Sequence, residues 1–207
     1  LAAVVPQKPD LIMLPKTCTA EDIQMLAQML DRLEAENGLP AGAVGILALI
    51  ETALGVENAF SIASASPRVQ ALFLGAEDLS ADLHCKRTKE GAEIQYARTR
   101  LVMAARAARI DVYDTPFTDV DDDEGLCADA ALAKSLGFTG KAAISPRHLG
   151  NINRCFSPTQ AEVDHANEVL AALEEGKRQG RGAVALHGKM IDAPIAARAK
   201  RTLADAE

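Results

Sequence analysis

Short apolar runs recur along the chain, each bounded by polar residues, glycine or proline. Runs of this length are typical of strands that are buried on both faces of a sheet. Five of them are predicted to be strands: Leu11–Leu14, Val44–Ile50, Val69–Gly75, Ile110–Tyr113 and Lys141–Ile144.

Between these strands, apolar residues recur at the three- and four-residue spacing of amphipathic helices. The clearest predicted helix covers Ile23–Glu36 and is opened by Thr19, and two more cover Gly91–Arg109 and Gly125–Leu136. Strands and helices alternate at intervals of about 30 residues, the size of a βαβ unit. This alternation predicts an α/β fold with a parallel sheet and crossover helices.

The C-terminal part of the chain follows a different pattern. A helix is predicted to begin with Ser157 as its N-cap, because a proline follows at the first helical position, and to end near Glu175. The segment Gly176–Gly182 is basic and glycine-rich and is predicted to be a linker. A last helix is predicted to start near Asp192.

Five strands are fewer than the eight of a (β/α)₈ barrel, a fold that takes about 250 residues. The pattern leaves two arrangements open. One is an open, doubly wound sheet, and the other is a barrel whose first strands are absent from this chain. The chain begins with Leu1 rather than methionine, which favours the second arrangement.

The composition of the chain argues against several classes of function. The 207 residues are 48% hydrophobic and carry a net charge of -7, which argues against binding along a nucleic-acid backbone because that needs a basic face. The chain has no apolar run of 18 residues and no charged region of a signal peptide at its start, so we expect neither a membrane span nor secretion. The four cysteines lack C-x-x-C spacing and are expected to be free thiols in the cytoplasm.

Two of the predicted strands end in acidic residues: Glu51 follows one, and Glu77 and Asp78 follow the next. The carboxyl ends of parallel strands lie on one side of a sheet, where α/β enzymes keep their chemistry. Each acid has a structural alternative, because an acid after a strand often caps the next helix. Together, Glu51 and Asp78 favour a Mg²⁺ site, since Mg²⁺ takes one or two carboxylates and leaves positions for substrate oxygens. Glu77 is the competing ligand.

Three other residues are candidates for a binding or catalytic role. Lys16 follows the first strand and could meet a phosphate or carboxylate, or be a solvated loop lysine; Asp114 follows the fourth strand. Asp192 precedes Pro194 by two residues, and this pattern favours a helix N-cap. The histidines show no paired spacing for zinc, and no glycine-rich phosphate loop occurs.

The chain carries four segments that match the pattern of one known family: Leu11–Lys16, Leu49–Thr52, Phe73–Leu79 and Gly188–Pro194. With them it resembles the HpcH/HpaI aldolase and citrate lyase superfamily, most of all the citrate lyase β-subunit-like branch that contains the malyl-CoA and citramalyl-CoA lyases. The Gly-Ala-Glu-Asp-Leu and Met-Ile-Asp-Ala-Pro stretches together are specific to that branch. The resemblance extends from about Asp10 to the C-terminus.

The resemblance implies a TIM (β/α)₈ barrel, with its first strands absent from this chain, over residues 1–156, and a C-terminal helical lid over residues 157–207. It implies a Mg²⁺ ion held by Glu51 and Asp78, with Glu51 also contacting the substrate. Lys16 is predicted to be a further substrate-binding residue. The resemblance further implies a homo-oligomer, a trimer or hexamer. In that oligomer Asp192 on the lid reaches a neighbouring subunit's active site and acts as the acid/base residue.

The expected activity is Mg²⁺-dependent cleavage, or formation, of a carbon–carbon bond in a 3-hydroxyacyl-CoA thioester such as citryl-, malyl- or citramalyl-CoA. Cleavage would give an acyl-CoA and a keto acid. Two features depart from the family. A substrate-binding arginine and an acidic Leu-Glu-Asp stretch on earlier barrel strands have no counterpart in this chain, and Ser145 stands where relatives often have histidine. The alternatives are a pyruvate-class metal-dependent aldolase that uses no CoA, and a non-catalytic barrel subunit that binds CoA esters.

Overall fold

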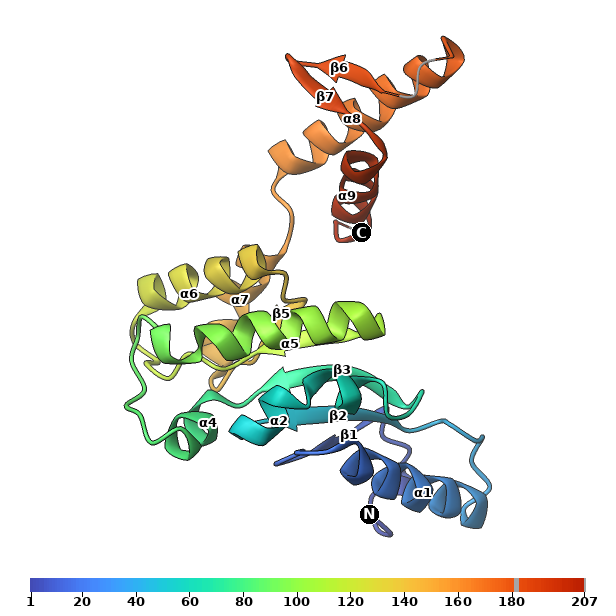
Figure 1. The fold of residues 1–207 in the computed structure, drawn as a ribbon, viewed down its shortest axis with the longest axis vertical. Helices are drawn as coiled ribbons and strands as arrows, with labels where there is room; N and C mark the ends of the chain where they lie inside the picture. Colours follow the sequence, from blue (N-terminus) through green and yellow to red (C-terminus); the bar gives the residue numbers. More distant parts are fainter. Residues whose placement is uncertain (181–182, 207) are drawn as a thin grey trace. The chain divides into compact units, whose positions relative to one another are not determined.

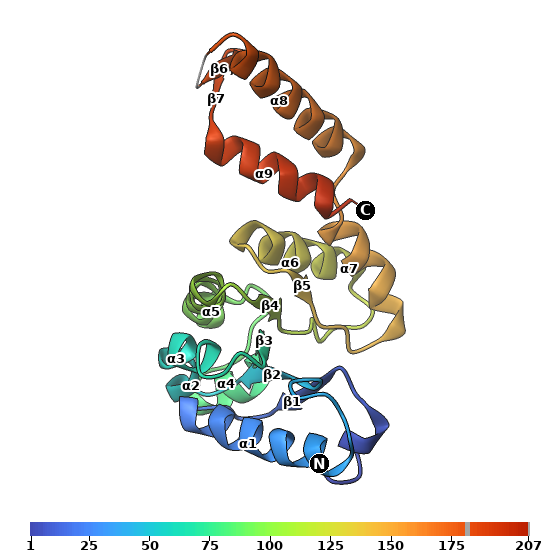
Figure 2. The ribbon, with the colours of Figure 1, turned by 90° about the vertical axis from the view of Figure 1, so that its right-hand side faces the viewer.

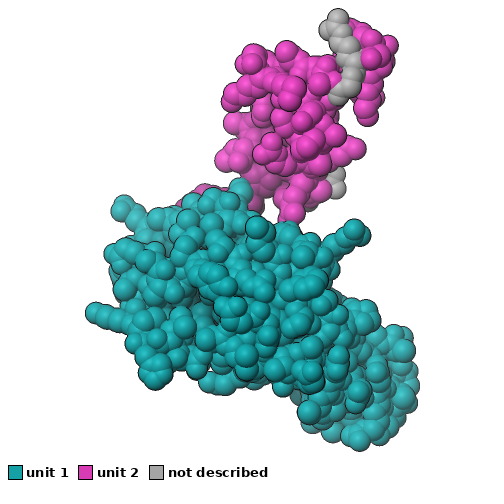
Figure 3. Space-filling model, in the orientation of Figure 1, with its two compact units in different colours: residues 1–152 teal, residues 153–207 magenta. Residues whose placement is uncertain are grey.

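A computed structural model describes residues 1–180 and 183–206 of the chain. The chain divides into two compact units, Leu1–Ile152 and Asn153–Glu207 (Figure 3). The division falls after residue 152, whereas the sequence placed a boundary after residue 156. The roles predicted for the two parts, a catalytic domain and a lid, stay predictions.

The first unit is built on a five-stranded parallel sheet, as the alternating pattern predicted. The strands pair side by side in sequence order (Figure 1). They are β1 (Leu11–Leu14), β2 (Gly45–Ile50), β3 (Val69–Leu74), β4 (Asp111–Asp114) and β5 (Gly140–Lys141). The fifth strand is shorter than the predicted Lys141–Ile144, because Ser145 caps the short 3₁₀ helix η3 (Pro146–His148) and the chain leaves the sheet before it.

Helices follow the strands, and their ends have local causes. They are α1 (Ala20–Glu36), α2 (Ala53–Glu57), α3 (Ala59–Ala63), α4 (Ala76–Asp82), α5 (Gln95–Ala108, after the 3₁₀ turn Ala92–Ile94), α6 (Asp123–Leu136) and α7 (Leu149–Phe156). Thr19 and Asp22 form a capping box at the start of α1, and Asp122 caps α6. Gly137, with φ of 105°, ends α6 in the left-handed conformation that favours glycine. The helix α7 was not predicted from the sequence.

The core lies between the sheet and helices α1, α3 and α5, which cover the same side of it (Figures 1 and 2). Ile46, Leu72 and Val112 are fully buried at this interface. On the opposite face, Leu49 and Phe73 are only partly buried. Leu49, Phe73 and Tyr113 lie side by side in register across three strands of that face.

The second unit packs two helices, α8 (Gln160–Arg178) and α9 (Ala193–Ala204), with an antiparallel hairpin of β6 (Val184–Leu186) and β7 (Lys189–Ile191). Its small core consists of Ala166, Val169, Leu173, Ile191 and Ala199. Both elements of the hairpin were missed by the sequence prediction, because three-residue strands carry no clear periodicity. The turn between them has His187 and Gly188 at positive φ, 48° and 75°.

Two predictions for this unit were wrong in detail. The cap of α8 is Thr159, in a capping box with Glu162, rather than Ser157. The helix then continues to Arg178 through the first part of the predicted linker Gly176–Gly182, whose residues 181–182 lie outside the described residues. In the described part of the chain, every helix is too short or too polar to cross a bilayer. No disulfide joins the four cysteines, all of which lie within the described residues.

Candidate metal and substrate site

Glu51 lies directly after β2 and is buried, with 6% of its surface exposed. Its Oε1 accepts a hydrogen bond of 2.9 Å from the backbone N–H of Lys16, which follows β1. The cap of the following helix α2 is Thr52, whose hydroxyl accepts the Gly55 N–H at 3.0 Å. The Glu51 carboxylate is therefore directed toward the end of the neighbouring strand instead of capping its own helix.

Asp78 lies in the first turn of α4, after β3, and is half-exposed. Its Oδ1 is 3.0 Å from Nζ of Lys16, so one lysine contacts Glu51 through its backbone and Asp78 through its side chain. Lys16 has a φ of 50°, a conformation that non-glycine residues adopt infrequently. The hydrogen bond to Asp78 raises the pKa of the Lys16 amine.

The charge of Asp78 affects the Glu51 carboxyl. Burial raises the pKa of Glu51, the Lys16 N–H opposes this, and the negative charge of Asp78 raises the pKa further. Such a rise is expected for a carboxyl that is buried beside a second acid. A divalent cation bound to both carboxylates would offset their repulsion.

Gly75 forms the wall against which Glu51 lies. A Cβ atom at Gly75 would be 2.7 Å from Glu51 Cβ and 2.8 Å from Glu51 Oε2, both closer than real Cβ contacts. The φ of Gly75 is -100°, so its backbone conformation does not require glycine. Glycine is needed there to leave room for the Glu51 carboxylate.

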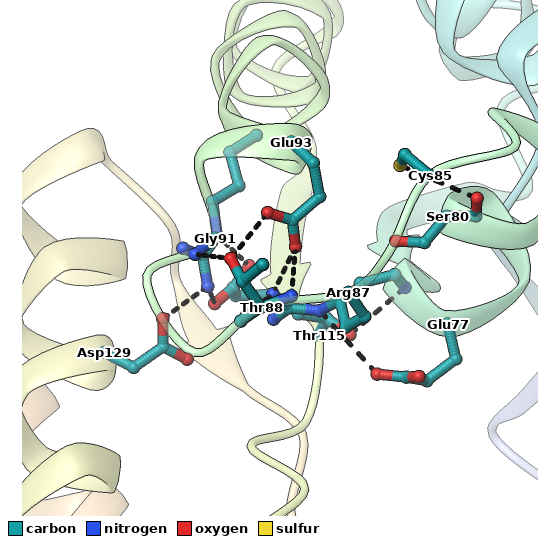
Figure 4. Close-up of polar contacts among 12 residues, drawn as sticks. Glu77, Ser80, Cys85, Arg87, Thr88, Gly91, Glu93, Thr115 and Asp129 are labelled. Carbon is teal, nitrogen blue, oxygen red and sulfur yellow. Dashed lines mark hydrogen bonds and ion pairs between the residues drawn. The ribbon is translucent and has the colours of Figure 1, made fainter.

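Glu77, the competing ligand, is directed elsewhere. Its Oε1 is 3.6 Å from Nε of Arg87, and Arg87 also pairs with Glu93 at 2.7 Å (Figure 4). Thr88 donates to the same Glu93 carboxylate through its backbone and its hydroxyl. Of the two adjacent acids, Asp78 is the one beside Lys16 and Glu51.

The Glu51 and Asp78 carboxylates suit a hard cation that takes only some of its ligands from the protein. Among residues 1–180 and 183–206, no group of three or more His, Cys, Asp or Glu side chains is arranged to hold a metal. Two carboxylates are what Mg²⁺ usually takes from a protein, with water and substrate oxygens as its other ligands. The oxygen donors of Glu51 and Asp78 therefore suit Mg²⁺ better than Zn²⁺, which prefers nitrogen and sulfur.

Asp114, at the end of β4, belongs to a separate cluster of four buried charged groups. It accepts hydrogen bonds from Arg98 at 3.0 and 2.8 Å and from Lys141 at 2.7 Å, and it is fully buried. Asp129 on α6 pairs with the same two cations, at 2.7 and 2.5 Å. The sequence prediction noted Asp114 alone. Arg98 was the missed signal, because it is a charged residue on the face of α5 that Leu101 and Ala105 share.

Asp192 belongs to the second unit, whereas the residues that Lys16 brings together belong to the first. Its Oδ1 accepts the Ile195 N–H at 3.4 Å and caps α9, with Pro194 in the first turn. Asp192 therefore makes the helix-cap contact that the sequence favoured for it.

Residues 1–146 match the family model described as HpcH/HpaI aldolase/citrate lyase. All 207 residues align with the citrate lyase subunit beta of Escherichia coli at 42% identity and cover 68% of that protein. The L-malyl-CoA/beta-methylmalyl-CoA lyase of Rhodobacter capsulatus is 34% identical over 88% of this chain and 63% of its own length. Among solved structures, the protein CitE from Mycobacterium tuberculosis in complex with magnesium, acetoacetate and coenzyme A has a TM-score of 0.77 and 31% identity, over 95% of this chain and 68% of that chain.

Proposed function

The chain belongs to the HpcH/HpaI aldolase/citrate lyase family, and on this basis we propose that it is a magnesium-dependent carbon–carbon lyase acting on a CoA thioester. The substrate is a 3-hydroxyacyl-CoA such as citryl-, malyl- or citramalyl-CoA, and the products are an acyl-CoA and a keto acid. The observation that carries the proposal is the convergence of Glu51 and Asp78 on Lys16 at the carboxyl ends of neighbouring strands.

The relatives support the same chemistry. The E. coli and R. capsulatus proteins are named as a citrate lyase subunit and as a malyl-CoA lyase, and the M. tuberculosis protein holds magnesium and coenzyme A. The malyl-CoA substrate in the name of the R. capsulatus enzyme and the coenzyme A in the M. tuberculosis structure favour a CoA-dependent lyase over a pyruvate-class aldolase.

Glu51 and Asp78 would hold the Mg²⁺ ion. When bound, it would act as a Lewis acid and polarise the carbonyl that forms during cleavage. Glu51 is fixed by the Lys16 N–H and by the Gly75 wall, so its carboxylate needs little rearrangement. The Lys16 ammonium, exposed and paired with Asp78, is positioned to bind a substrate oxygen anion.

Cleavage removes the proton of the substrate hydroxyl as the carbon–carbon bond breaks. The electron pair of that bond goes to the thioester fragment, which leaves as an enolate and is then protonated on carbon. We assign the exchange of a proton with the enolate to Asp192. It would act from a C-terminal lid at a neighbouring subunit's site in a homo-oligomer.

We also infer that the five-stranded sheet is part of a TIM barrel, formed by the domain over residues 1–156. The half-buried row of Leu49, Phe73 and Tyr113 supports this, because the inward face of a barrel is filled by such side chains. The second domain, residues 157–207, is then the lid. Four cysteines without disulfides support a cytoplasmic location.

The test is a lyase assay of the full-length protein on a panel of CoA thioesters, with and without EDTA. Glu51→Gln and Asp78→Asn should each abolish Mg²⁺-dependent turnover, because each removes a charged ligand. Glu77→Gln is the matched control, since Glu77 faces Arg87, and it should retain turnover.

Full activity of Glu51→Gln or Asp78→Asn would show that the metal assignment is wrong. Turnover of a free hydroxy keto acid, but of no thioester, would instead identify a pyruvate-class aldolase, and binding of CoA esters without any turnover would identify a non-catalytic subunit.

A further inference from the structure

Helix α4, which carries Asp78, depends on other elements at its start. Its N-cap is Gly75, which has no side chain to accept the N–H groups of the first turn that lack a partner within the helix. The Gly75 carbonyl accepts the Leu79 N–H at 3.2 Å, and the Gly75 N–H donates to the carbonyl of Ile50 at 2.9 Å. The N–H of Ala76, the first helical residue, needs an acceptor from outside the helix.

Thr115, the residue directly after β4, supplies that acceptor. Its Oγ1 lies 3.2 Å from the Ala76 nitrogen, and its side chain is buried, with 1% of the residue exposed (Figure 4). Its carbonyl accepts the Lys141 ammonium at 2.7 Å, and Lys141 is itself held by the buried Asp114. Thr115 is therefore fixed by the buried ionic cluster while its hydroxyl holds the start of α4.

The opposite end of α4 is attached as well. Oδ2 of Asp82, the last helical residue, accepts the Ala53 N–H at 2.7 Å. Ala53 is two residues after Glu51, so this bond ties the end of α4 to the segment that carries the other carboxylate. Asp78 lies between the two attachments and two residues from Ala76.

We propose that Thr115 is a positioning residue for the metal site, because its hydroxyl fixes the first residue of the helix that presents Asp78 to Glu51. The inference rests on the proposed function, since it assumes that these carboxylates bind Mg²⁺. Without the hydroxyl, the buried Ala76 N–H has lost its acceptor and the first turn of α4 must move to find another. Asp78 would move with it.

The experiment measures Mg²⁺ binding by calorimetry, with the metal alone and the full-length protein, next to thermal unfolding of each variant. Thr115→Val keeps the shape and removes the hydroxyl, whereas Thr115→Ser keeps the hydroxyl. Thr139→Val is the matched control: Thr139 Oγ1 also accepts a backbone N–H, that of Val112 at 2.8 Å, but at the opposite end of β4.

We expect Thr115→Val to weaken Mg²⁺ binding by about 10- to 100-fold, the usual effect of changing a group that orients a metal ligand. Thr115→Ser should bind like the unaltered protein. Thr139→Val should lower the unfolding temperature without changing Mg²⁺ affinity. Thr115→Ala is a second variant without the hydroxyl in case the valine is not accommodated, and it should weaken binding similarly.

Unchanged Mg²⁺ affinity in Thr115→Val or Thr115→Ala would overturn the positioning role while leaving the proposed function intact. So would an equal loss of affinity in Thr115→Ser or in Thr139→Val, because the effect would then be general destabilisation. If the unaltered protein binds no Mg²⁺, the proposed function and this inference both fail.

Discussion

Replacing Gly75 with alanine tests whether the Glu51 carboxylate requires the space beside that glycine. The new methyl group would lie 2.7 Å from Glu51 Cβ and 2.8 Å from Glu51 Oε2, with Leu49 Cδ1 at 3.1 Å. The Gly75 backbone has a φ of -100°, which alanine adopts without strain. The consequences of Gly75→Ala therefore come from contact alone.

The size of the effect follows from two opposing terms. Overpacking of this kind typically costs about 1–3 kcal/mol. A Gly→Ala change also restricts the unfolded chain, which favours the folded state by about 0.4–1 kcal/mol. The net loss should be about 1–2 kcal/mol, or roughly 2–8 °C in the unfolding temperature of a unit of this size. Displacement of Glu51 should also weaken Mg²⁺ binding by about 10- to 100-fold.

The assay is thermal unfolding followed by circular dichroism, with Mg²⁺ affinity from calorimetry. Gly150→Ala is the matched control, because Gly150 lies in helix α7 and an added Cβ has nothing within 4 Å. That variant should be more stable, by up to about 1 kcal/mol, since alanine is the better helix former. The reasoning is refuted if Gly75→Ala is as stable as the unaltered protein and binds Mg²⁺ equally well.

Three other predictions concern groups with defined partners. Asp192→Ala should lose about 0.5–2 kcal/mol with the α9 cap, whereas Asp192→Asn keeps an acceptor oxygen and should stay folded while turnover drops about 10²- to 10⁴-fold; full turnover of Asp192→Asn would refute the acid/base role. The Arg68 guanidinium lowers the pKa of buried Glu34 from 4.5 to about 2, so this carboxylate stabilises the fold at neutral pH and the stabilisation is lost as the pH falls through that range. Glu34→Gln should therefore reduce the difference in urea stability between neutral pH and about pH 3, and an unchanged difference would contradict this. Asp114→Asn leaves the Lys141 ammonium undercompensated and should cost about 3–5 kcal/mol in denaturant unfolding, so a loss below about 1 kcal/mol would argue against the ionic cluster.

The parallel sheet could be predicted because its strands are continuous apolar runs with polar ends. The meeting of Glu51 and Asp78 could also be anticipated, since consecutive parallel strands place their carboxyl ends on one side of the sheet. Their assignment as Mg²⁺ ligands is still a proposal. The choice between Asp78 and Glu77 depended on the family resemblance, and the structure adds a physical difference: Arg87 draws Glu77 away.

Other features depend on contacts that no local pattern contains. The sequence offered two roles for Lys16 and could not reveal that its backbone and side chain contact two different acids. The acceptor for the Ala76 N–H is 39 residues away in sequence, on Thr115, so helix-capping patterns could not identify it. The hairpin before α9 was missed because its strands have only three residues each.

The contacts of Lys16 join segments that lie 35 and 62 residues apart in the chain. Such a constellation exists only after three strands have paired, so an unfolded molecule offers magnesium no comparable chelate. On the proposed assignment, ion binding and folding would therefore be thermodynamically linked: at a free ion concentration 100 times the dissociation constant, the native state would gain about 2.7 kcal/mol. The magnesium level around the protein would then influence its stability as well as its rate of turnover.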